Sequence, residues 1–303
     1  MHAIELENVR KSFGPVQAVD GLNVRVPQGC VYGFLGPNGA GKTTTLRMIM
    51  DIIRPDSGTI RLLDRPASSP ARDRVGYMPE ERGLYRKMRV AAVLQYFGTL
   101  KGMTADLLRQ RVPEWLERVN LAEHANKKVE ELSRGMHQKL QFAVTVIHGP
   151  DVLILDEPFS GLDPVNQDLL REIITVLRDE GRTVLFSTHV MHEAERLSDF
   201  LVLIDNGRVI VDGTLDEIRA GHESHTVSVE LEGDSGFLRT LPIVAAVTPD
   251  GRRVQVTLQA DANPQDLLAA LIERAPVRLF EIRQPSLHEI FVRLVGGSHV
   301  ENL

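Results

Sequence analysis

Short apolar runs alternate with amphipathic stretches over about the first 220 residues of the chain. The runs Val31–Leu35, Val152–Leu155 and Val184–Ser187 are almost wholly apolar, which is typical of parallel strands that are covered on both faces. A helical pattern follows each of the first two runs, and a third helix is expected to begin near Met191. The alternation predicts an α/β domain.

A long stretch from about residue 88 to residue 149 departs from this alternation. It is rich in leucine, arginine, glutamate and glutamine, and it carries few strand signals. We therefore expect a helical subdomain inserted into the α/β domain.

The pattern changes again after a break near Ala220–Ser224. Beyond the break, apolar and polar residues alternate in Val227–Leu231 and Val254–Leu258, as they do in half-buried strands. The turn Pro249–Gly251 is expected to join two of these strands as a hairpin.

Two helix starts complete this C-terminal part. Asn263 followed by Pro264 provides a capping side chain and a proline in the first turn. Ser286–Glu289 has the spacing of a capping box ahead of the last helix. A chain of 303 residues suits two domains. We predict an α/β domain over residues 1–221 and a small C-terminal α+β domain over residues 222–303.

A glycine-rich segment between the first apolar run and its helix matches the phosphate-binding loop in full. Its glycines let backbone N–H groups turn towards β- and γ-phosphate, where side chains would clash. Lys42 would place a positive charge on these phosphates, and the Thr43 hydroxyl would ligate Mg²⁺. The predicted nucleotide-binding residues in this segment are Gly36, Pro37, Asn38, Gly39, Ala40, Gly41, Lys42, Thr43 and Thr44.

Two carboxylates, Asp156 and Glu157, end the second apolar run. Folding alone does not account for them, because unpaired buried charges are costly, unless the strand end reaches solvent. At a phosphate site, Asp156 can hold Mg²⁺ through water, and Glu157 can polarise the water that attacks γ-phosphate. We therefore predict Asp156 and Thr43 as metal-binding residues and Glu157 as a catalytic residue.

Four further motifs accompany the phosphate loop and the carboxylate pair. Leu132–Gln138 resembles the signature of the ABC ATPases, Ser160–Asp163 matches their D-loop, and Ser187–His189 matches their switch histidine. Phe13 falls where that family places an aromatic ring that stacks on adenine. Along the chain these motifs follow the order in which the family carries them. Over about the first 220 residues, the sequence therefore resembles the ABC nucleotide-binding domain.

The resemblance implies a composite site formed by two copies of the chain. In the family's geometry, the signature does not reach the nucleotide on its own phosphate loop and closes over γ-phosphate held by a second protomer. A homodimer would therefore sandwich ATP and Mg²⁺ between its two copies. His189 would contact γ-phosphate; the alternative is that His189 only packs in the core. The residues carried over as nucleotide-binding are Phe13, Ser133, Gly135, Met136 and Asp163.

The sequence departs from the family pattern at three positions. Glu80 stands where a glutamine normally contacts Mg²⁺ and the attacking water. A carboxylate still offers oxygen to the metal but adds negative charge beside the phosphates, so we expect Glu80 to keep a metal-binding and catalytic role with altered strength. Met136 and Arg134 replace the usual signature glutamine and first glycine, while Ser133 and Gly135 are retained.

Two segments resemble one branch of the family, the separate ATP-binding subunits of bacterial sodium and drug exporters. These segments are Gly76–Tyr85 and Pro285–Phe291. The resemblance implies a partner, a six-helix membrane permease encoded as its own chain. Arg82–Phe97 would form part of the groove that receives the permease. In this segment, Tyr85, Tyr96 and Phe97 are expected either to contact the permease or to pack in the core of the helical subdomain, and the sequence favours neither role. The C-terminal domain is expected to stabilise a dimer, with ligand sensing as the alternative.

Composition limits the partners and the location. The net charge of −6 and the isoelectric point near 6.0 lack the basic footprint of a nucleic-acid-binding protein. A single cysteine, Cys30, permits no internal disulfide, which fits a reducing cytoplasm. The N-terminus carries charges where a signal peptide needs an apolar core. We expect a cytoplasmic protein held at the inner face of the cell membrane through a permease, with no nucleic acid partner.

Two other functions use similar motifs. A non-transport ABC ATPase acting on the ribosome or DNA is the main alternative. Its translation-factor relatives carry two such domains in one chain, and its chromosome-maintenance relatives carry a long coiled coil, whereas this sequence has neither. A small-molecule kinase would need the phosphate loop but not the signature or the D-loop.

Overall fold

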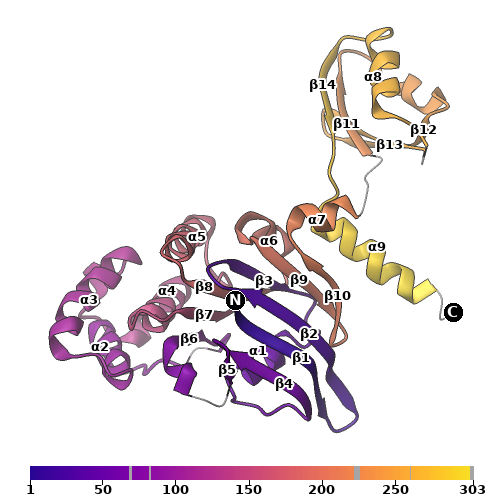
Figure 1. The fold of residues 1–303 in the computed structure, drawn as a ribbon. Helices are drawn as coiled ribbons and strands as arrows, with labels where there is room; N and C mark the ends of the chain where they lie inside the picture. The colour runs from indigo at the N-terminus through magenta and orange to yellow at the C-terminus, as the bar shows by residue number, and fades with distance from the viewer. Residues whose placement is uncertain (68–69, 82, 222–225, 260, 301–303) are drawn as a thin grey trace. The chain divides into compact units, whose positions relative to one another are not determined.

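The structure is a computed structural model that describes residues 1–67, 70–81, 83–221, 226–259 and 261–300. The chain divides into two compact units, Met1–Leu215 and Asp216–Leu303 (Figure 1). The predicted break near Ala220–Ser224 lies mostly outside the described residues.

The first unit is built on a six-stranded sheet. In spatial order its strands are β10 (Arg208–Gly213), β9 (Phe200–Asp205), β3 (Val31–Leu35), β8 (Thr183–Thr188), β7 (Val152–Asp156) and β6 (Val75–Met78). Strands β9 to β6 run parallel, and β10 pairs antiparallel at one edge. Every residue of β3, β7 and β8 is buried, which accounts for their apolar sequences. The predicted α/β architecture is confirmed.

A second, antiparallel sheet lies in the same unit and was not predicted from the sequence. Its strands, in spatial order, are β2 (Val16–Pro27), β1 (His2–Phe13), β4 (Ser57–Leu62) and β5 (Arg65–Pro66). The pairing of β1 with β2 shifts register at several points. Each shift breaks the two-residue alternation of apolar and polar side chains, so the strands do not show the usual sequence pattern.

Helix α1 (Lys42–Ile49) packs between the two sheets. Its side chains Leu46, Met48 and Ile49 are buried in one apolar cluster with residues of β1, β2, β3 and β7. Interiors are packed as densely as organic crystals, so the helix is held from both sides. The start of α1, and with it the loop that precedes it, is therefore fixed in position.

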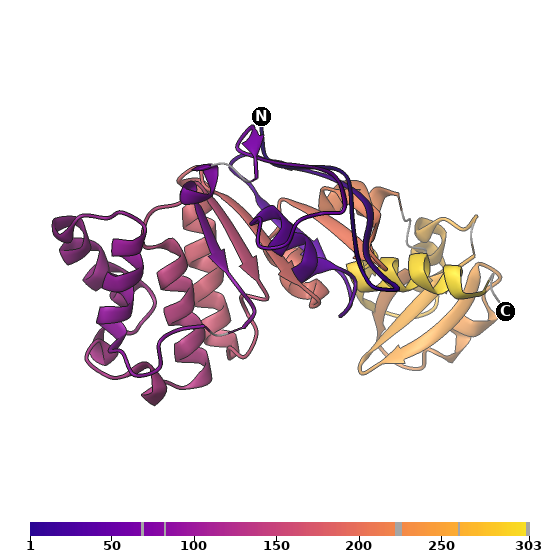
Figure 2. The same ribbon diagram turned by 90° about the horizontal axis from the view of Figure 1, so that it is seen from below.

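Helices α2 (Val90–Leu100), α3 (Ala105–Arg118) and α4 (Arg134–Val146) lie together at one end of the first unit (Figure 2). They fall within the stretch predicted to be helical. Trp115 on α3 and Phe142 on α4 are among the largest fully buried side chains. The 3₁₀ turns of this unit are Pro70–Arg74, Ala122–His124 and Val129–Glu131.

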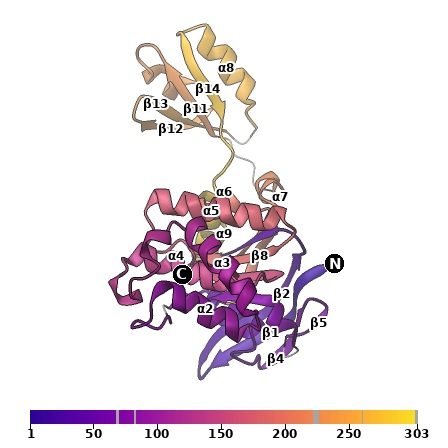
Figure 3. The same cartoon turned by 90° about the vertical axis from the view of Figure 1, so that its left-hand side faces the viewer.

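Two more helices, α5 (Pro164–Asp179) and α6 (Met191–Leu197), lie on the side of the unit opposite β1, β2 and β4 (Figure 3). Arg171 of α5 and Glu193 of α6 are both largely buried and form an ion pair with 3.1 Å between Nε and Oε2. This pair joins the two helices that follow β7 and β8.

The second unit contains a four-stranded antiparallel sheet and confirms the predicted α+β class. The sheet order is β12 (Val244–Asp250), β13 (Arg253–Leu258), β11 (Thr226–Leu231) and β14 (Val277–Ile282). The helical elements are α7 (Leu215–Ala220), Gly236–Thr240 in 3₁₀ form, α8 (Pro264–Ile272) and α9 (Leu287–Val300). Leu267 and Leu271 of α8 are fully buried in a cluster with residues of β11 and β13.

The local predictions for this unit are mostly confirmed. Asn263 caps α8, and Ser286 and Glu289 form the expected reciprocal capping bonds before α9. The turn after Pro249 does join a hairpin, but it connects β13 to β12 rather than to β11. Strand β12 was missed because several of its residues are exposed on both faces, which leaves no alternating pattern.

Over the described ranges, no helix combines the length and the apolar character that crossing a bilayer requires.

We predict that Phe142→Ala lowers the free energy of unfolding of the first unit by about 3–5 kcal/mol, because it leaves a cavity in a fully buried site. Trp115 is the single tryptophan of the chain, so its fluorescence during urea unfolding reports on this helical part. The control Leu100→Ala, at a side chain that is 64% exposed, should change stability by less than about 0.5 kcal/mol. Equal losses in the two variants would contradict the packing described for α4.

Candidate active site

The phosphate-binding loop leaves the carboxyl end of β3 and enters α1. Gly39 and Gly41 have φ angles of 85° and 100°, in the left-handed region that favours glycine. At Gly41 a Cβ atom would lie 2.3 Å from the carbonyl oxygen of Ala18, and at Gly36 it would lie 2.3 Å from that of Ile204. The loop is therefore tightly enclosed by neighbouring main chain, and glycine is the residue that fits.

Lys42 is 7% exposed, and its ammonium lies in the curve of the loop. Its Nζ donates to the carbonyl oxygens of Gly36 and Pro37 at 2.7 and 3.0 Å. Burial lowers the pKa of Lys42, while the nearby carboxylates of Glu157, Asp156 and Glu80 act in the opposite direction. One buried cation thus lies within electrostatic reach of three acidic side chains.

Asp156 ends β7 and is fully buried. Its Oδ1 accepts a hydrogen bond from the Ser187 hydroxyl of the neighbouring strand β8. Its Oδ2 is buried and has no hydrogen-bond partner among the described residues. An unsatisfied buried carboxylate oxygen is costly, and a hydrated cation would satisfy it. The donor set therefore fits a Mg²⁺ ion held through water.

Glu157 follows at φ 50°, an unusual angle for a residue other than glycine. Its backbone N–H points at Ser187, with 3.1 Å to Oγ and 3.2 Å to the carbonyl oxygen. The side chain is largely buried, and its Oε1 lies 2.8 Å from Nδ1 of His189, which is half exposed. The structure thus places Glu157 and His189 in direct contact.

A pocket of about 300 Å³ opens over the loop. Its polar lining joins the start of α1 to Glu80, which follows β6, and to Glu157, which follows β7. In open parallel sheets, ligands bind beyond the carboxyl ends of the strands, and the pocket lies at that edge. Its described lining residues are Ala18, Asn38, Gly39, Gly41, Lys42, Thr43, Thr44, Glu80 and Glu157.

Several predicted site residues lie outside the described lining of this pocket. Ser133 caps α4, with its Oγ 3.3 Å from the N–H of Met136, and both Ser133 and the neighbouring Arg134 are exposed. Asp163 caps α5, and hydrogen bonds from Asn166 lower the pKa of its carboxyl. The Phe13 ring is 48% exposed at the end of β1. Gly135 and Met136 are partly buried near the start of α4.

Helix α4 touches the site at two other points that sequence reasoning missed. Gln138 donates to the carbonyl oxygens of Glu157 and Pro158 at 3.3 and 3.0 Å. Gln141 donates to those of Pro79 and Glu81, on either side of Glu80, at 2.7 and 3.3 Å. Their spacing of three along a helix was the available signal, since it puts both side chains on one face.

Ser187 was also missed as a supporting residue. It was noted only as the first residue of the histidine motif, yet it hydrogen-bonds both Asp156 and the backbone of Glu157. Register is the reason, because Ser187 lies opposite Asp156 in the pairing of β7 with β8. A sequence does not reveal which parallel strands are neighbours.

A phosphate loop and a carboxylate pair at the edge of a parallel sheet, with an inserted helical part, define a P-loop nucleotide-binding domain of the ABC class. The family model for ABC transporters matches residues 19–160. The model for the C-terminal domain of DrrA1-3-like ATP-binding proteins matches residues 213–295.

The chain is similar to known proteins over nearly its whole length. It is 42% identical to the ABC transporter ATP-binding protein YhaQ of Bacillus subtilis, over 97% of this chain and 99% of YhaQ. It is 39% identical to the Nod factor export ATP-binding protein I of Ralstonia nicotianae, and the alignment covers 97% of this chain and 94% of that protein. The chain belongs to the ATP-binding proteins of ABC transporters.

Solved structures agree with this assignment. An ATP-binding subunit of an ABC transporter superposes with a TM-score of 0.68 and 30% identity, over 72% of this chain and 92% of that one. CbiO1 of Clostridium perfringens, part of the ABC transporter complex CbiONQ, superposes with a TM-score of 0.65 and 26% sequence identity. The match covers 72% of this chain and 91% of CbiO1.

Alanine substitutions at two glycines of the loop distinguish the effect of a steric clash on ATP binding from the effect of an unfavourable φ angle. We predict that Gly41→Ala weakens binding of a fluorescent ATP analogue by more than about tenfold, because the new methyl group meets the Ala18 carbonyl. Gly39→Ala carries a similar φ but meets nothing within 4 Å, so it should lose only severalfold. Equal losses in a fluorescence titration would contradict the enclosure of the loop at Gly41.

Proposed function

We propose that this protein binds and hydrolyses ATP as a homodimer and drives a separate membrane permease of an exporter. The observation that supports this most directly is a pocket lined by the phosphate loop and Glu157, with the buried carboxylate of Asp156 within electrostatic reach of Lys42. A structural role for these buried charges is disfavoured, because Asp156 Oδ2 is left without a partner among the described residues.

Backbone N–H groups of the loop and the ammonium of Lys42 would hold the phosphates, with the N-terminus of α1 pointing at them. Lys42 would exchange its bonds to the Gly36 and Pro37 carbonyls for phosphate oxygens, at little cost because its position is already set. Thr43, Glu80 and Asp156 would hold Mg²⁺, whose charge offsets that of the phosphates when bound.

Glu157 is the proposed general base. It is largely buried at the pocket wall, and its contact with His189 fixes the direction of the carboxylate. A carboxylate so placed can accept a proton from a water molecule lined up on γ-phosphate. His189 would then hold Glu157 in position and contact γ-phosphate with its other ring nitrogen.

Ser133, Gly135, Met136 and Asp163 are proposed to act on the nucleotide of a second copy. They lie at the N-terminal ends of α4 and α5, outside the described lining of the chain's own pocket. Exposed helix N-termini bind anions, so a partner's γ-phosphate suits the start of α4. Phe13, with its exposed ring, is the proposed adenine platform.

The permease is proposed to dock near the segment that follows Glu80, at the inner face of the membrane. Tyr85, Tyr96 and Phe97 form one cluster, with ring centroids 5.3–6.2 Å apart. Tyr85 is 51% exposed and Tyr96 39%, which favours contacts with a partner over core packing. Arg82, the first residue of the predicted groove segment, lies outside the described residues.

Export as the direction of transport rests on the relatives. Nod factor export ATP-binding proteins align over 97% of this chain, so the C-terminal unit is included in the likeness. The match to the DrrA1-3-like C-terminal domain supports the same branch. We extend the proposal to the sodium and drug exporters because the sequences of Gly76–Tyr85 and Pro285–Phe291 resemble those of their ATP-binding subunits.

We predict that Glu157→Gln is monomeric alone and dimeric with Mg-ATP, because ATP binds but is not hydrolysed and the two copies stay closed. Size-exclusion chromatography with light scattering measures the mass, and phosphate release should fall by at least about a hundredfold. The control Glu172→Gln, an exposed carboxylate on α5, should keep wild-type turnover.

Two results would overturn parts of this proposal. Persistent monomer with bound ATP would refute the sandwich, and unchanged turnover would refute Glu157 as the base. Adding Ser133→Arg to Glu157→Gln should abolish the dimer without weakening ATP binding, since Ser133 serves only the partner's nucleotide.

Glu80 offers a test of electrostatics at the pocket. We predict that Glu80→Gln tightens ATP binding in the absence of Mg²⁺ by about two- to fivefold, because one negative charge beside the phosphates is removed. The Mg²⁺ concentration for half-maximal turnover should rise in parallel, because a charged ligand is lost. Glu81→Gln, at an exposed carboxylate outside the described lining, is the matched control. The same shift in both variants would assign the effect to net charge alone.

A further inference from the structure

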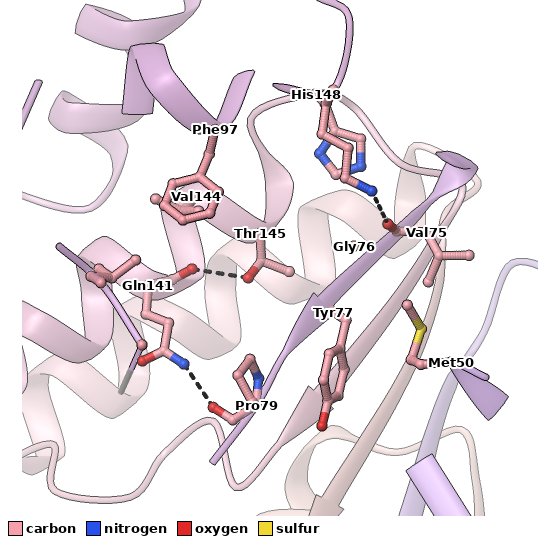
Figure 4. Close-up of a pocket in the computed structure, with 13 residues that line it drawn as sticks. Met50, Val75, Gly76, Tyr77, Pro79, Phe97, Gln141, Val144, Thr145 and His148 are labelled. Carbon is pink, nitrogen blue, oxygen red and sulfur yellow. Dashed lines mark hydrogen bonds between the residues drawn. The ribbon is translucent and has the colours of Figure 1, made fainter. Parts of the chain in front are cut away.

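Two further pockets of the first unit differ in their lining. The one between β6, α2 and α4 is largely apolar, with Val75, Phe97 and Val144 in its wall (Figure 4). The other, here called the charged pocket, has a volume of about 230 Å³ and lies between α3, the start of β7 and the end of α5. It is at the amino end of β7, whereas Asp156 ends the same strand at the nucleotide site. The charged pocket and the nucleotide pocket share no residue of their described linings.

One face of α3 supplies most of the charges in the charged pocket. Glu114, Trp115 and Arg118 follow Arg111 by three, four and seven positions, so the four side chains share that face. Arg118 pairs with Glu114, with 2.9 Å between Nη2 and Oε1. The guanidinium carbon of Arg118 also lies 5.0 Å from the centroid of the Trp115 ring. The side chain of Arg111 is partly buried and has neither a hydrogen bond nor an ion pair with the described residues.

Arg182, in the turn between α5 and β8, lines the charged pocket from the side of the sheet. Its Nη1 donates to the carbonyl oxygens of Gly149 and Pro150, both at 2.9 Å. The same nitrogen lies 3.3 Å from Oδ1 of Asp151. These contacts fix the guanidinium through one nitrogen. Its Nε and Nη2 make no hydrogen bond to the described residues, so two of its nitrogens remain available to a ligand.

Trp115 adds an unsatisfied donor to the wall of the charged pocket. The residue is 1% exposed, and its Nε1 has no hydrogen-bond partner among the described residues. An indole N–H can only donate, and an unpaired donor in the interior is costly. Buried tryptophans usually find an acceptor for this group. Arg111, Trp115 and Arg182 thus line one pocket with donors that lack an acceptor in the described part of the chain.

The charges and the apolar part of the wall select the kind of acceptor. Three arginines and two glutamates line the charged pocket, which leaves an excess of one positive charge. A monoanion balances this excess, whereas a dianion such as phosphate would be repelled more strongly by Glu114 and Glu180. A planar carboxylate also matches a guanidinium through two parallel hydrogen bonds. Val146, Leu153 and Leu177 offer apolar surface to a hydrocarbon group attached to that carboxylate.

We propose that the charged pocket binds a small monocarboxylate with an apolar body, as a second ligand besides ATP. Arg111 and Arg182 hold the carboxylate, and the Trp115 N–H donates to one of its oxygens. The hydrocarbon group packs on Leu153 and Leu177. Because α3 carries Arg111 and the turn before β8 carries Arg182, the bound acid joins the helical part to the sheet. The site goes beyond the proposed function, since it requires neither a nucleotide nor a second copy of the chain.

The test follows Trp115 by NMR, because it is the single tryptophan and gives the one indole N–H signal of the chain. The full chain is titrated with 4-methylpentanoate as the probe and with neutral 4-methylpentanamide as its matched control. The acid should bind with a dissociation constant of about 0.1–5 mM and move the indole proton downfield until it saturates, because the N–H gains an acceptor. Equal shifts with acid and amide, or no saturable shift up to roughly 50 mM acid, would overturn the proposal.

Substitutions on α3 make the test specific to the charged pocket. Arg111→Leu should weaken binding of the acid by about tenfold or more, because the carboxylate loses a charged donor. Arg111→Lys should lose less, since the charge is kept while the planar pair of donors is lost. The control Arg109→Leu, at an exposed arginine outside the described lining, should bind the acid as the wild type does. ATP binding should be unchanged in all three variants, which shows that the first unit is folded. Equal losses in Arg109→Leu and Arg111→Leu would assign the effect to net charge and contradict the site.

Two competitors distinguish this site from other places where an anion could bind. A non-hydrolysable ATP analogue at saturation should leave binding of the acid intact, because the two pockets share no described lining residue. Displacement of the acid by the analogue would place the acid at the phosphate loop and overturn the proposal. Inorganic phosphate should bind at least about tenfold more weakly than the acid. Tighter binding of phosphate, with the same shift of the indole proton, would overturn the assignment to a monocarboxylate.

Discussion

The active site depends on one buried cation. Lys42 is enclosed by main-chain carbonyls, and it is stable there because three carboxylates lie within electrostatic reach. Its place follows from the packing of α1 between two sheets, which fixes the first turn of the helix from both sides. Neighbouring backbone encloses the loop at two points, because Cβ atoms added at Gly36 and Gly41 would collide with carbonyl oxygens. These contacts hold Lys42 and both ends of the loop in one arrangement in this structure.

Helix α4 connects the separate parts of the machinery. Its N-terminus carries Ser133, its middle holds the loop after Glu157 through Gln138, and Gln141 holds the segment around Glu80. All three contacts belong to one rigid element, so a displacement of the helix changes them together.

The sequence was most informative where chemistry restricts the residue type. The glycines, Lys42 and the two acids stand out in the sequence because folding alone rarely produces them at those spacings, and the structure brings them together at one edge of the sheet. The caps of α8 and α9 could be predicted because short-range bonds decide them. The antiparallel sheet was missed because bulges break the alternation of β1 and β2. Ser187 and Gln141 were missed because their partners are set by tertiary neighbours, which no local pattern encodes.

The backbone at Glu157 shows how stability and chemistry are opposed in this fold. Side chains of successive residues in a strand normally point to opposite faces of the sheet. At Glu157 the φ angle of 50° ends the extended backbone, so its carboxylate does not follow this alternation. Glycine or asparagine accepts such an angle more easily than glutamate does. Substitution by either would relax the backbone and would remove the proposed general base. A glutamate at this angle is therefore not explained by stability, and it agrees with the role of general base proposed for Glu157.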